Sequence, residues 1–310
     1  MPALWMLSAS FAFAVMGACV KLASVHYSIA EIVLYRGLVG VAVLFLLARA
    51  GQRSLRTVTP LAHLWRGAVG VLSLWLWFAA IARLPLATAV TLNYMSPIWT
   101  AVMLVVLAFW RGETRPAWQP LAAILASFGG VVLILQPSFA AGQWSGALMA
   151  LASGMLAALA YLLVRRLSRM GEPEYRVVFY FSLANVAAGL LGVFAQPGGW
   201  HALDWPGAAL LLGVGLSGTA GQVALTRAYS LGRTLVVANL QYTGIVFSSA
   251  LGILVWGDRI DPHTWLGTAV IVGSCLAASY YNARVNARAA AVPAKTAPVA
   301  PFAVLESIRK

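Results

Sequence analysis

Residues 84–113 read LPLATAVTLNYMSPIWTAVMLVVLAFWRGE, and residues 231–258, LGRTLVVANLQYTGIVFSSALGILVWGD, repeat the same pattern in weaker form. Each copy opens on a tight Leu-Pro or Leu-Gly turn and continues as a mostly apolar helix that carries Asn and Tyr. Each copy then ends on Gly and an acidic residue, before another apolar run. Duplicated membrane segments of this kind place a binding site where the two copies meet, near the middle of the bilayer. The repeated pattern therefore favours a transport protein.

The composition is that of a membrane protein. Of the 310 residues, 61% are hydrophobic and only 9% are charged, whereas soluble domains carry about 25% charged residues. Apolar runs of roughly 18–25 residues, long enough to cross the hydrocarbon core as helices, recur along the chain. They predict ten transmembrane helices: Leu4–Ala23, Ile29–Ala48, Leu64–Ala82, Leu86–Trp110, Trp118–Leu135, Ser145–Val164, Tyr175–Phe194, Trp205–Ala228, Thr234–Trp256 and Thr264–Tyr281. The short connections leave no room for a separate soluble catalytic domain.

The ten predicted spans divide into two halves of five. An odd number of spans per half gives the second half the opposite orientation, so that a pseudo-twofold axis lies in the membrane plane. We therefore expect an all-α membrane protein built from two inverted five-helix repeats, residues 1–140 and 141–282. Residues 283–310 are rich in Ala and Pro with scattered Arg and Lys. This segment is expected to be a disordered tail on the cytoplasmic face, because it is too polar and too often broken by proline to pack.

The net charge of +13 is distributed unevenly. With a cytoplasmic N-terminus, 17 of the 21 Lys and Arg residues, Arg66 included, fall on the cytoplasmic side. Only Lys21, Arg36, Arg83 and Arg259 fall on the opposite side or at outer helix ends. This asymmetry is typical of the positive-inside rule, and it brings basic side chains to anionic lipid headgroups. A nucleic-acid partner fits the distribution less well, so we expect lipid and a small-molecule substrate as partners, and no nucleic acid.

Motifs for metals and cofactors are absent from the sequence. No Gly-Lys pair occurs, which excludes a phosphate-binding loop of the GxxxxGK type. The histidines lie near predicted helix ends and the cysteines lie inside predicted spans, where a thiol usually acts as a small hydrophobic group. We therefore assign no metal, no disulfide and no cofactor to these residues: His26, His63, His201, His263, Cys19 and Cys275.

One sequence motif resembles that of an enzyme. Residues 215–218, Gly-Leu-Ser-Gly, have the GxSG form found around the serine of intramembrane proteases. A nucleophilic serine needs a base within hydrogen-bonding reach, and no histidine lies inside a later span. An intramembrane hydrolase that uses Ser217 is therefore only a remote alternative. Gly213, Ser217 and Gly221 recur at four-residue spacing on the same helix, which favours a close contact between helices.

Polar residues inside the spans are the candidates for a substrate cavity, because each destabilises the membrane state unless it faces protein or water. The polar residues of the fourth and ninth spans lie eight to ten positions into each copy, about 12–15 Å deep at 1.5 Å per residue. Pro97 is expected to interrupt the fourth helix just beyond them, which is tolerated only beside protein or a wet cavity. The candidate cavity residues are Trp77, Asn93, Tyr94, Tyr161, Gln222, Asn239 and Gln241. For the amides, hydrogen bonding between helices is the alternative.

Arg36 lies about eight residues into the second span, where insertion of an arginine costs about 2.5–3.5 kcal/mol. It therefore needs a partner, for which Glu31, Tyr35 and the surroundings of Lys21 are the candidates. We read Lys21, Glu31 and Arg36 as an ion pair at the outer ends of the first two helices, either structural or part of an outer gate. The other functional reading makes Arg36 a carboxylate-binding residue. All eight acidic residues lie near or outside span ends, which favours facilitated transport or exchange over proton coupling.

The duplicated unit resembles the EamA family of the drug/metabolite transporter superfamily. The likeness rests on LPLATAVTLNYMSP with Gly112-Glu113 in the first copy and on ALTRAYSLGRTLVVANLQYTGIVF with Gly257-Asp258 in the second, and it covers about residues 3–282. Asp258 stands where Glu is usual in this family. The resemblance implies ten helices, cytoplasmic termini in a bacterial inner membrane, and a central cavity between the halves. It also implies export of amino acids or related metabolites, since similar members include exporters of aromatic amino acids.

The favoured function is thus an inner-membrane transporter that exports amino acids or related small metabolites by alternating access. A monomer suffices for this function, since a fused pair of repeats can complete a pathway by itself. Uptake of nucleoside-like or sulfonium metabolites stays open as an alternative, because a sequence does not encode the direction of transport.

Overall fold

The chain is helical throughout the part that the structure describes. The computed structural model describes residues 2–81, 83–84, 86–110, 112, 118–136, 143–196, 200–257 and 262–291. These residues form twelve helices: α1 (Pro2–Ala23), α2 (Ile29–Ala50), α3 (Pro60–Ile81), α4 (Leu86–Asn93), α5 (Ser96–Trp110), α6 (Trp118–Leu135), α7 (Trp144–Arg169), α8 (Glu174–Ala195), α9 (Trp205–Leu231), α10 (Thr234–Leu240), α11 (Thr243–Trp256) and α12 (Pro262–Ala291). They contain no strand, so the predicted all-α class is confirmed for these residues.

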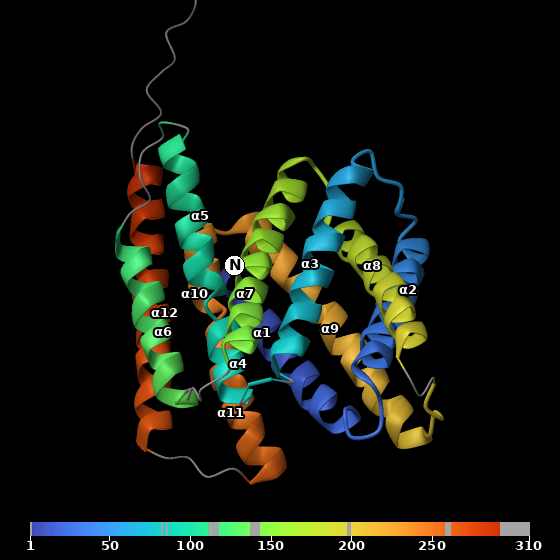
Figure 1. The fold of residues 1–310 in the computed structure, drawn as a ribbon. Coiled ribbons are helices and arrows are strands. Elements are labelled where there is room, and N and C mark those ends of the chain that lie inside the picture. Colours follow the sequence, from blue (N-terminus) through green and yellow to red (C-terminus); the bar gives the residue numbers. More distant parts are fainter. Residues whose placement is uncertain are drawn as a thin grey trace, which may run out of the picture.

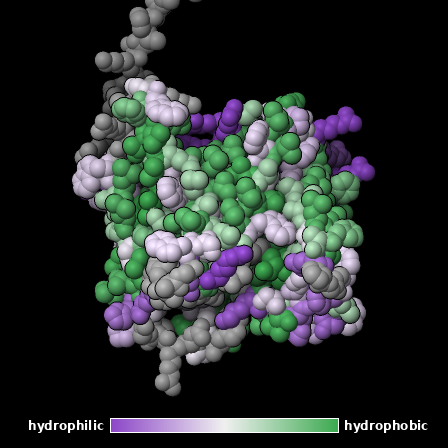
Figure 2. Space-filling model, viewed as in Figure 1, coloured by the Kyte–Doolittle hydropathy of each residue, from purple (hydrophilic) through white to green (hydrophobic). Residues whose placement is uncertain are grey.

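The helices have the length and composition of membrane spans. Eight helical segments of the described chain are long and apolar enough to cross a bilayer: Pro2–Ala23, Ile29–Ala50, Ala89–Trp110, Trp118–Leu135, Trp144–Arg169, Glu174–Ala195, Trp205–Leu231 and Thr234–Val255. The two other predicted spans, α3 and α12, are helical but do not belong to this set. In Figure 2, hydrophobic side chains cover the middle of the visible face, and hydrophilic ones gather mostly toward its upper and lower edges. Multi-pass insertion in a membrane follows.

Two of the predicted spans are interrupted near their middle. The fourth is divided at Tyr94 and Met95 into α4 and α5, so the break precedes Pro97 instead of following it. Pro97 lies in the first turn of α5, where a missing N–H is tolerated. The ninth span is divided at Gln241 and Tyr242 into α10 and α11, although no proline is present. The polar residues of both copies therefore lie at breaks in the helical backbone. Irregular backbone inside a membrane is tolerated only beside protein or water.

The C-terminal helix is longer than predicted. Helix α12 continues to Ala291, whereas the sequence analysis placed the start of a disordered tail at Ala283. Arginine and alanine are strong helix formers, and they follow one another after Asn282. They extend the helix past the apolar segment. The remaining tail, 292–310, and the acidic residues Glu113 and Asp258 lie outside the described residues.

The helices pack in pairs that join the first part of the chain to the second. Helix α1 packs on α9, α2 on α8, α3 on α7 and α6 on α12, and Figure 1 shows the last three of these pairs side by side. A Cβ added to Gly213 would come within 3.1 Å of Cys19, and one added to Gly221 within 2.8 Å of Phe13. The predicted stripe of small residues therefore does form a close helix contact, between α9 and α1.

Candidate functional site

The interior between α2, α3, α8 and α9 contains two arginines. Arg66 is 3% exposed, and its Nη2 donates to Oε1 of Gln222 at 3.5 Å. Arg36 donates from Nη1 to Oδ1 of Asn185 at 3.2 Å. The guanidinium carbons of Arg36 and Arg66 lie 5.5 Å and 4.0 Å from the centroid of the same ring, that of Phe181. Cation–π contacts at such distances are attractive, so Phe181 fixes both guanidinium groups near one another.

Two glycines make room for these long side chains. A Cβ on Gly70 would lie 2.3 Å from Nη1 of Arg66 and 2.8 Å from the Phe181 ring. A Cβ on Gly218 would lie 2.9 Å from Nε of Arg36. No other residue type fits at either position unless the guanidinium group moves, so the sequence is shaped around both arginines.

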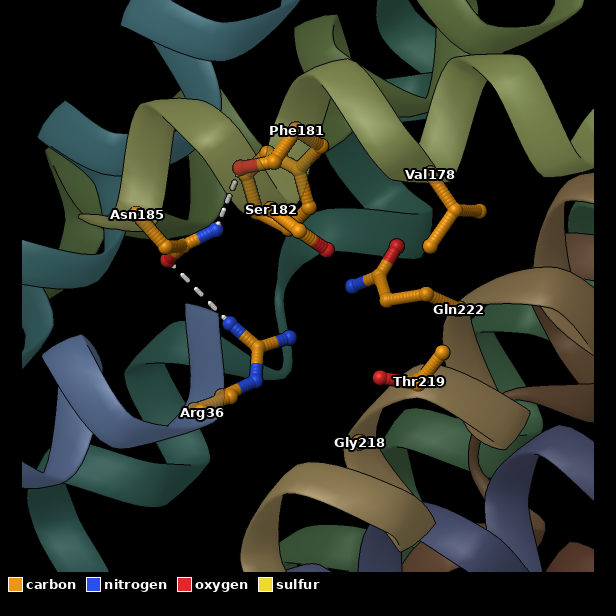
Figure 3. Close-up of a pocket in the computed structure, with 8 residues that line it drawn as sticks. All are labelled: Arg36, Val178, Phe181, Ser182, Asn185, Gly218, Thr219 and Gln222. Carbon is orange, nitrogen blue, oxygen red and sulfur yellow. Dashed lines mark hydrogen bonds between the residues drawn. The ribbon is translucent and has the colours of Figure 1, made fainter. Parts of the chain in front are cut away.

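A small cavity lies beside Arg36, as Figure 3 shows. Side chains of α2, α8 and α9 point toward it from three sides. Its volume of about 10 Å³ is roughly the space of one water molecule, whereas sites for organic ligands measure about 300–1,000 Å³. A metabolite therefore enters only if the helices move apart. The cavity is lined by Arg36, Val178, Phe181, Ser182, Asn185, Gly218, Thr219 and Gln222.

Tyrosines from both parts of the chain form a second interior cluster. The ring of Tyr161 stacks on that of Tyr229 at 5.4 Å, and Tyr94 stacks on Tyr242 at 6.3 Å. Gln241, at the break between α10 and α11, donates to the Tyr161 hydroxyl at 2.9 Å. The hydroxyls of Tyr229 and Tyr242 are buried, and within the described chain neither has a hydrogen-bond partner. Buried polar atoms are normally paired, so these hydroxyls are available to water or a ligand.

The predicted cavity residues separate into two groups. Tyr94, Tyr161 and Gln241 belong to the tyrosine cluster, and Gln222 contacts Arg66. Their assignment to a substrate site stays a prediction, now supported by their common position in the interior.

The two asparagines instead join helices. Asn93 donates from Nδ2 to the Ser153 hydroxyl at 2.8 Å, and Ser153 is itself hydrogen-bonded to Ser73 of α3. Asn239 is fully buried and donates to the Ser274 carbonyl of α12 at 3.4 Å. This is the geometry of the alternative reading, hydrogen bonding between helices.

Trp77 lies on the same helix as Arg66 but at a distance from it. It is partly buried on α3, eleven residues and thus about 16 Å along the helix from Arg66. The structure does not bring it to the residues around Arg66, and its role in a cavity stays a prediction.

Glu31 and Arg36 take different partners in the described structure. The two residues are five positions apart, which places them on different faces of α2 because a helix has 3.6 residues per turn. Glu31 instead accepts hydrogen bonds from the Ser28 N–H at 2.8 Å and from the His201 N–H at 2.7 Å. It caps the start of α2 and joins that helix to the loop before α9. Arg36 reaches Asn185, and a gate role for Lys21, Glu31 and Arg36 stays untested.

Sequence analysis missed Arg66, Asn185 and Phe181. Arg66 was counted among the cytoplasmic charges because it lies only two residues into the predicted span. Helix α3 begins earlier, at Pro60, which turns Arg66 into the protein. The spacing of Arg66 and Gly70, one helical turn apart, is the signal that points to this arrangement, since a glycine there leaves room for a folded-back guanidinium group.

A different charged cluster lies at the end of the molecule formed by the α2–α3 and α7–α8 loops. The carboxylate of Glu172 is 1% exposed and accepts from Nη1 of Arg176 at 2.9 Å. It also accepts from the hydroxyls of Thr57 and Thr59, and Nε2 of His63 lies 3.4 Å away. Burial alone raises a carboxyl pKa, but these donors outweigh it and lower the pKa of Glu172 to about 2. The cluster is a link between two loops in which the carboxylate of Glu172 accepts hydrogen bonds from the α2–α3 loop and from the start of α8.

In the described chain, Ser217 is not hydrogen-bonded to a base, and no cluster of metal-binding side chains is found. Ser217 donates its hydroxyl to the Gly213 carbonyl of its own helix at 2.5 Å, not to a base. Among the residues that the structure describes, no group of three His, Cys, Asp or Glu side chains could hold a metal ion.

Comparison with known proteins shows that the chain is similar to membrane transporters. The model of the EamA-like transporter family matches residues 1–136 and 144–280. The pseudopaline exporter CntI of Pseudomonas aeruginosa is 37% identical over 278 residues, which cover 87% of this chain and 93% of that one. A riboflavin transporter of Rhizobium johnstonii is 29% identical over 88% of this chain and 89% of its own length. A crystal structure at 19% identity matches with a TM-score of 0.78, over 92% of this chain and 98% of the other.

Proposed function

The chain belongs to the EamA-like transporter family, and from this premise we propose that it exports amino acids or closely related metabolites across a bacterial inner membrane by alternating access. Membership makes it a membrane transporter and not an enzyme. One observation carries the proposal: a buried polar interior, built around Arg36, Arg66 and Tyr161, lies between helices of the two halves of the chain. Aromatic amino acids are one candidate class, since two tyrosine stacks line this interior.

The helix pairs support two inverted repeats. Taking each interrupted pair as one span gives ten segments, and the proposed inversion relates α1 to α7, α2 to α8 and α3 to α9. The packing of α1 on α9 then corresponds to that of α7 on α3, and the pair α2–α8 corresponds to itself. The family model also matches the chain in two stretches, residues 1–136 and 144–280, which are separated by a short gap near residue 140. We therefore keep 1–140 and 141–282 as the proposed repeats.

The proposed orientation places the Glu172 cluster in the cytoplasm. Arg176 and Tyr175 donate to the Ser54 carbonyl, which brings the α2–α3 and α7–α8 loops together. Arg165, near the end of α7, is hydrogen-bonded to Thr234 at the start of α10. The basic ends of these helices thus lie on one side, as the positive-inside rule requires of the cytoplasmic face.

The small size of the cavity beside Arg36 supports alternating access. The cavity beside Arg36 has room for about one water molecule, so a metabolite does not fit beside Arg36 in the described conformation. Two halves related by a twofold axis can open to either side in turn by the same movement. No described carboxylate contacts the arginine pair, which supports facilitated transport or exchange.

Counterflow in liposomes tests the export proposal. Purified protein is reconstituted, the liposomes are loaded with one unlabelled amino acid, and entry of the same labelled compound is measured against protein-free liposomes. We expect exchange of at least one member of a panel of neutral, acidic and aromatic amino acids. Exchange of nucleosides or sulfonium compounds alone would favour the uptake alternative. Accumulation driven only by a pH difference would contradict a facilitative mechanism.

A further inference from the structure

The interior holds two positive charges without a matching negative charge. Within the described chain, the carboxylates that form ion pairs are Glu31 and Glu172, and their partners do not include Arg36 or Arg66. The guanidinium carbons of Arg36 and Arg66 lie 5.5 Å and 4.0 Å from the centroid of the Phe181 ring. The distance between the two guanidinium carbons is therefore at most the sum of these two values. Like charges within this distance repel one another, and more so where water is excluded. The described residues therefore supply no carboxylate that pairs with either charge.

Neutral amides hold the two arginines in place. Asn185 accepts from Arg36 and itself donates to the Phe181 carbonyl at 2.7 Å, which fixes the direction of its oxygen. Gln222 accepts from Arg66. An amide orients a guanidinium group but does not neutralise it. Donors remain unused as well, namely Nε of Arg36 and both Nε and Nη1 of Arg66. Charged groups with free donors in a buried site are prepared to bind an anion.

We propose that the transported molecule carries two carboxylates, one for each guanidinium group. This inference rests on the proposed function and narrows its substrate class to compounds with two carboxylates, acidic amino acids among them, in place of aromatic amino acids with one. A substrate with one carboxylate leaves one buried charge unmatched, whereas a dicarboxylate neutralises both. Arginine suits this task because it is always charged and presents its donors in a planar fork that matches a carboxylate. Carboxylates reach the pair when α2 and α3 separate from α8 and α9, since the present cavity holds about one water.

A binding measurement on the whole protein in detergent tests this assignment. The probes are glutarate, with two carboxylates, and glutaramate, in which an amide replaces one of them at nearly the same size. Affinity is measured from the rise of the unfolding temperature with ligand concentration at constant ionic strength. A charge-assisted hydrogen bond is worth enough for about a tenfold change in affinity. We therefore expect glutarate to bind at least about ten times more tightly than glutaramate.

Single substitutions then test whether each guanidinium group binds one of the two carboxylates. Arg36→Gln and Arg66→Gln each leave one guanidinium group, so each should remove the preference for glutarate. Arg36→Lys and Arg66→Lys keep the positive charge and should retain part of the preference for glutarate. The matched control is Arg56→Gln, the same change at an exposed position outside the helices, and it should leave the preference intact.

Four outcomes would overturn the inference. They are equal affinity for the two probes, no binding of either, a preference that persists in both glutamine variants, and inorganic phosphate binding more tightly than glutarate.

The counterflow assay separates this inference from the export proposal. If neutral amino acids exchange, and do so equally fast in the Arg36→Gln and Arg66→Gln variants, the export proposal stands and the dicarboxylate inference fails. If glutarate binds through both arginines but no compound is exchanged, the binding site stands and the export proposal fails.

Discussion

The cluster around Glu172 and the arginine pair in the interior both hold guanidinium groups, but among the described residues only the first supplies a carboxylate. Arg176 lies 2.9 Å from a carboxylate oxygen of Glu172, which two threonine hydroxyls also approach. Among the described residues, Arg36 and Arg66 are hydrogen-bonded to amides and lie over the Phe181 ring, and neither forms an ion pair with a carboxylate. A buried charge whose partner is missing destabilises a fold by several kcal/mol. The comparison thus separates residues that hold two loops together from residues that are kept ready for a ligand.

The largest expected effect on stability comes from breaking the matched cluster. Glu172→Ala leaves Arg176 and His63 without their carboxylate, which should lower the free energy of unfolding by about 3 kcal/mol. The measurement is denaturation in detergent micelles, followed by tryptophan fluorescence. Glu174→Ala is the control, because this carboxylate has no hydrogen bond in the described structure. A loss of stability in the control of the same size would show that the network around Glu172 is not its cause.

A smaller effect is expected from crowding the unmatched pair. In Gly70→Ala the added methyl group comes too close to Nη1 of Arg66. Overpacking of this kind costs about 1–3 kcal/mol, and the guanidinium group must move off the Phe181 ring. We expect weaker glutarate binding together with a modest loss of stability. Gly17→Ala, with no atom within 4 Å of the added Cβ, serves as the control. Unchanged glutarate affinity in Gly70→Ala would contradict the placement of Arg66 in the site.

Removing one arginine should hardly lower stability, and this sharpens the contrast with Glu172. Replacing a buried charge that lacks a partner by a neutral group is neutral or stabilising. Arg66→Gln should therefore keep or raise the free energy of unfolding in the absence of ligand, while it removes the preference for dicarboxylates. The same denaturation assay gives the answer. A loss of about 3 kcal/mol, as expected for Glu172→Ala, would make Arg66 a structural residue.

The smallest effect is expected from pH. The pKa of Glu172 is lowered to about 2 from an ordinary value of 4.5, so the unfolded chain binds a proton more readily than the folded one. The stabilisation by this carboxylate is complete above about pH 4.5 and is lost only as the pH falls toward 2. Between pH 5 and 8 Glu172 itself stays ionised, so its own titration should not change the effect of Glu172→Gln in this range. The comparison is made in a His63→Gln background, because His63 lies 3.4 Å from the same carboxylate and histidines titrate in this range. A difference that changes with pH in that background would contradict the assigned partners.

Much of the architecture was predictable because hydrophobic length is a local property. Apolar runs located the helices, and their composition identified membrane spans. The stripe of Gly213, Ser217 and Gly221 predicted a helix contact that α9 does make with α1. Helix breaks were harder to place: Pro97 marked the first within a few residues, but the break at Gln241 has no proline to announce it.

The sequence by itself determined the class of protein, since twenty apolar residues in a row are stable as a helix in hydrocarbon whatever surrounds them. It also identified Arg36 as a residue in need of a partner. Only the tertiary structure decided which partner, because Glu31 lies on another face of α2 while Asn185 faces Arg36 from a helix 149 positions away in the sequence. It likewise turned Arg66 from a surface charge into an interior one. Such pairings depend on how helices rotate and pack against one another, and hydropathy along a chain carries no record of that.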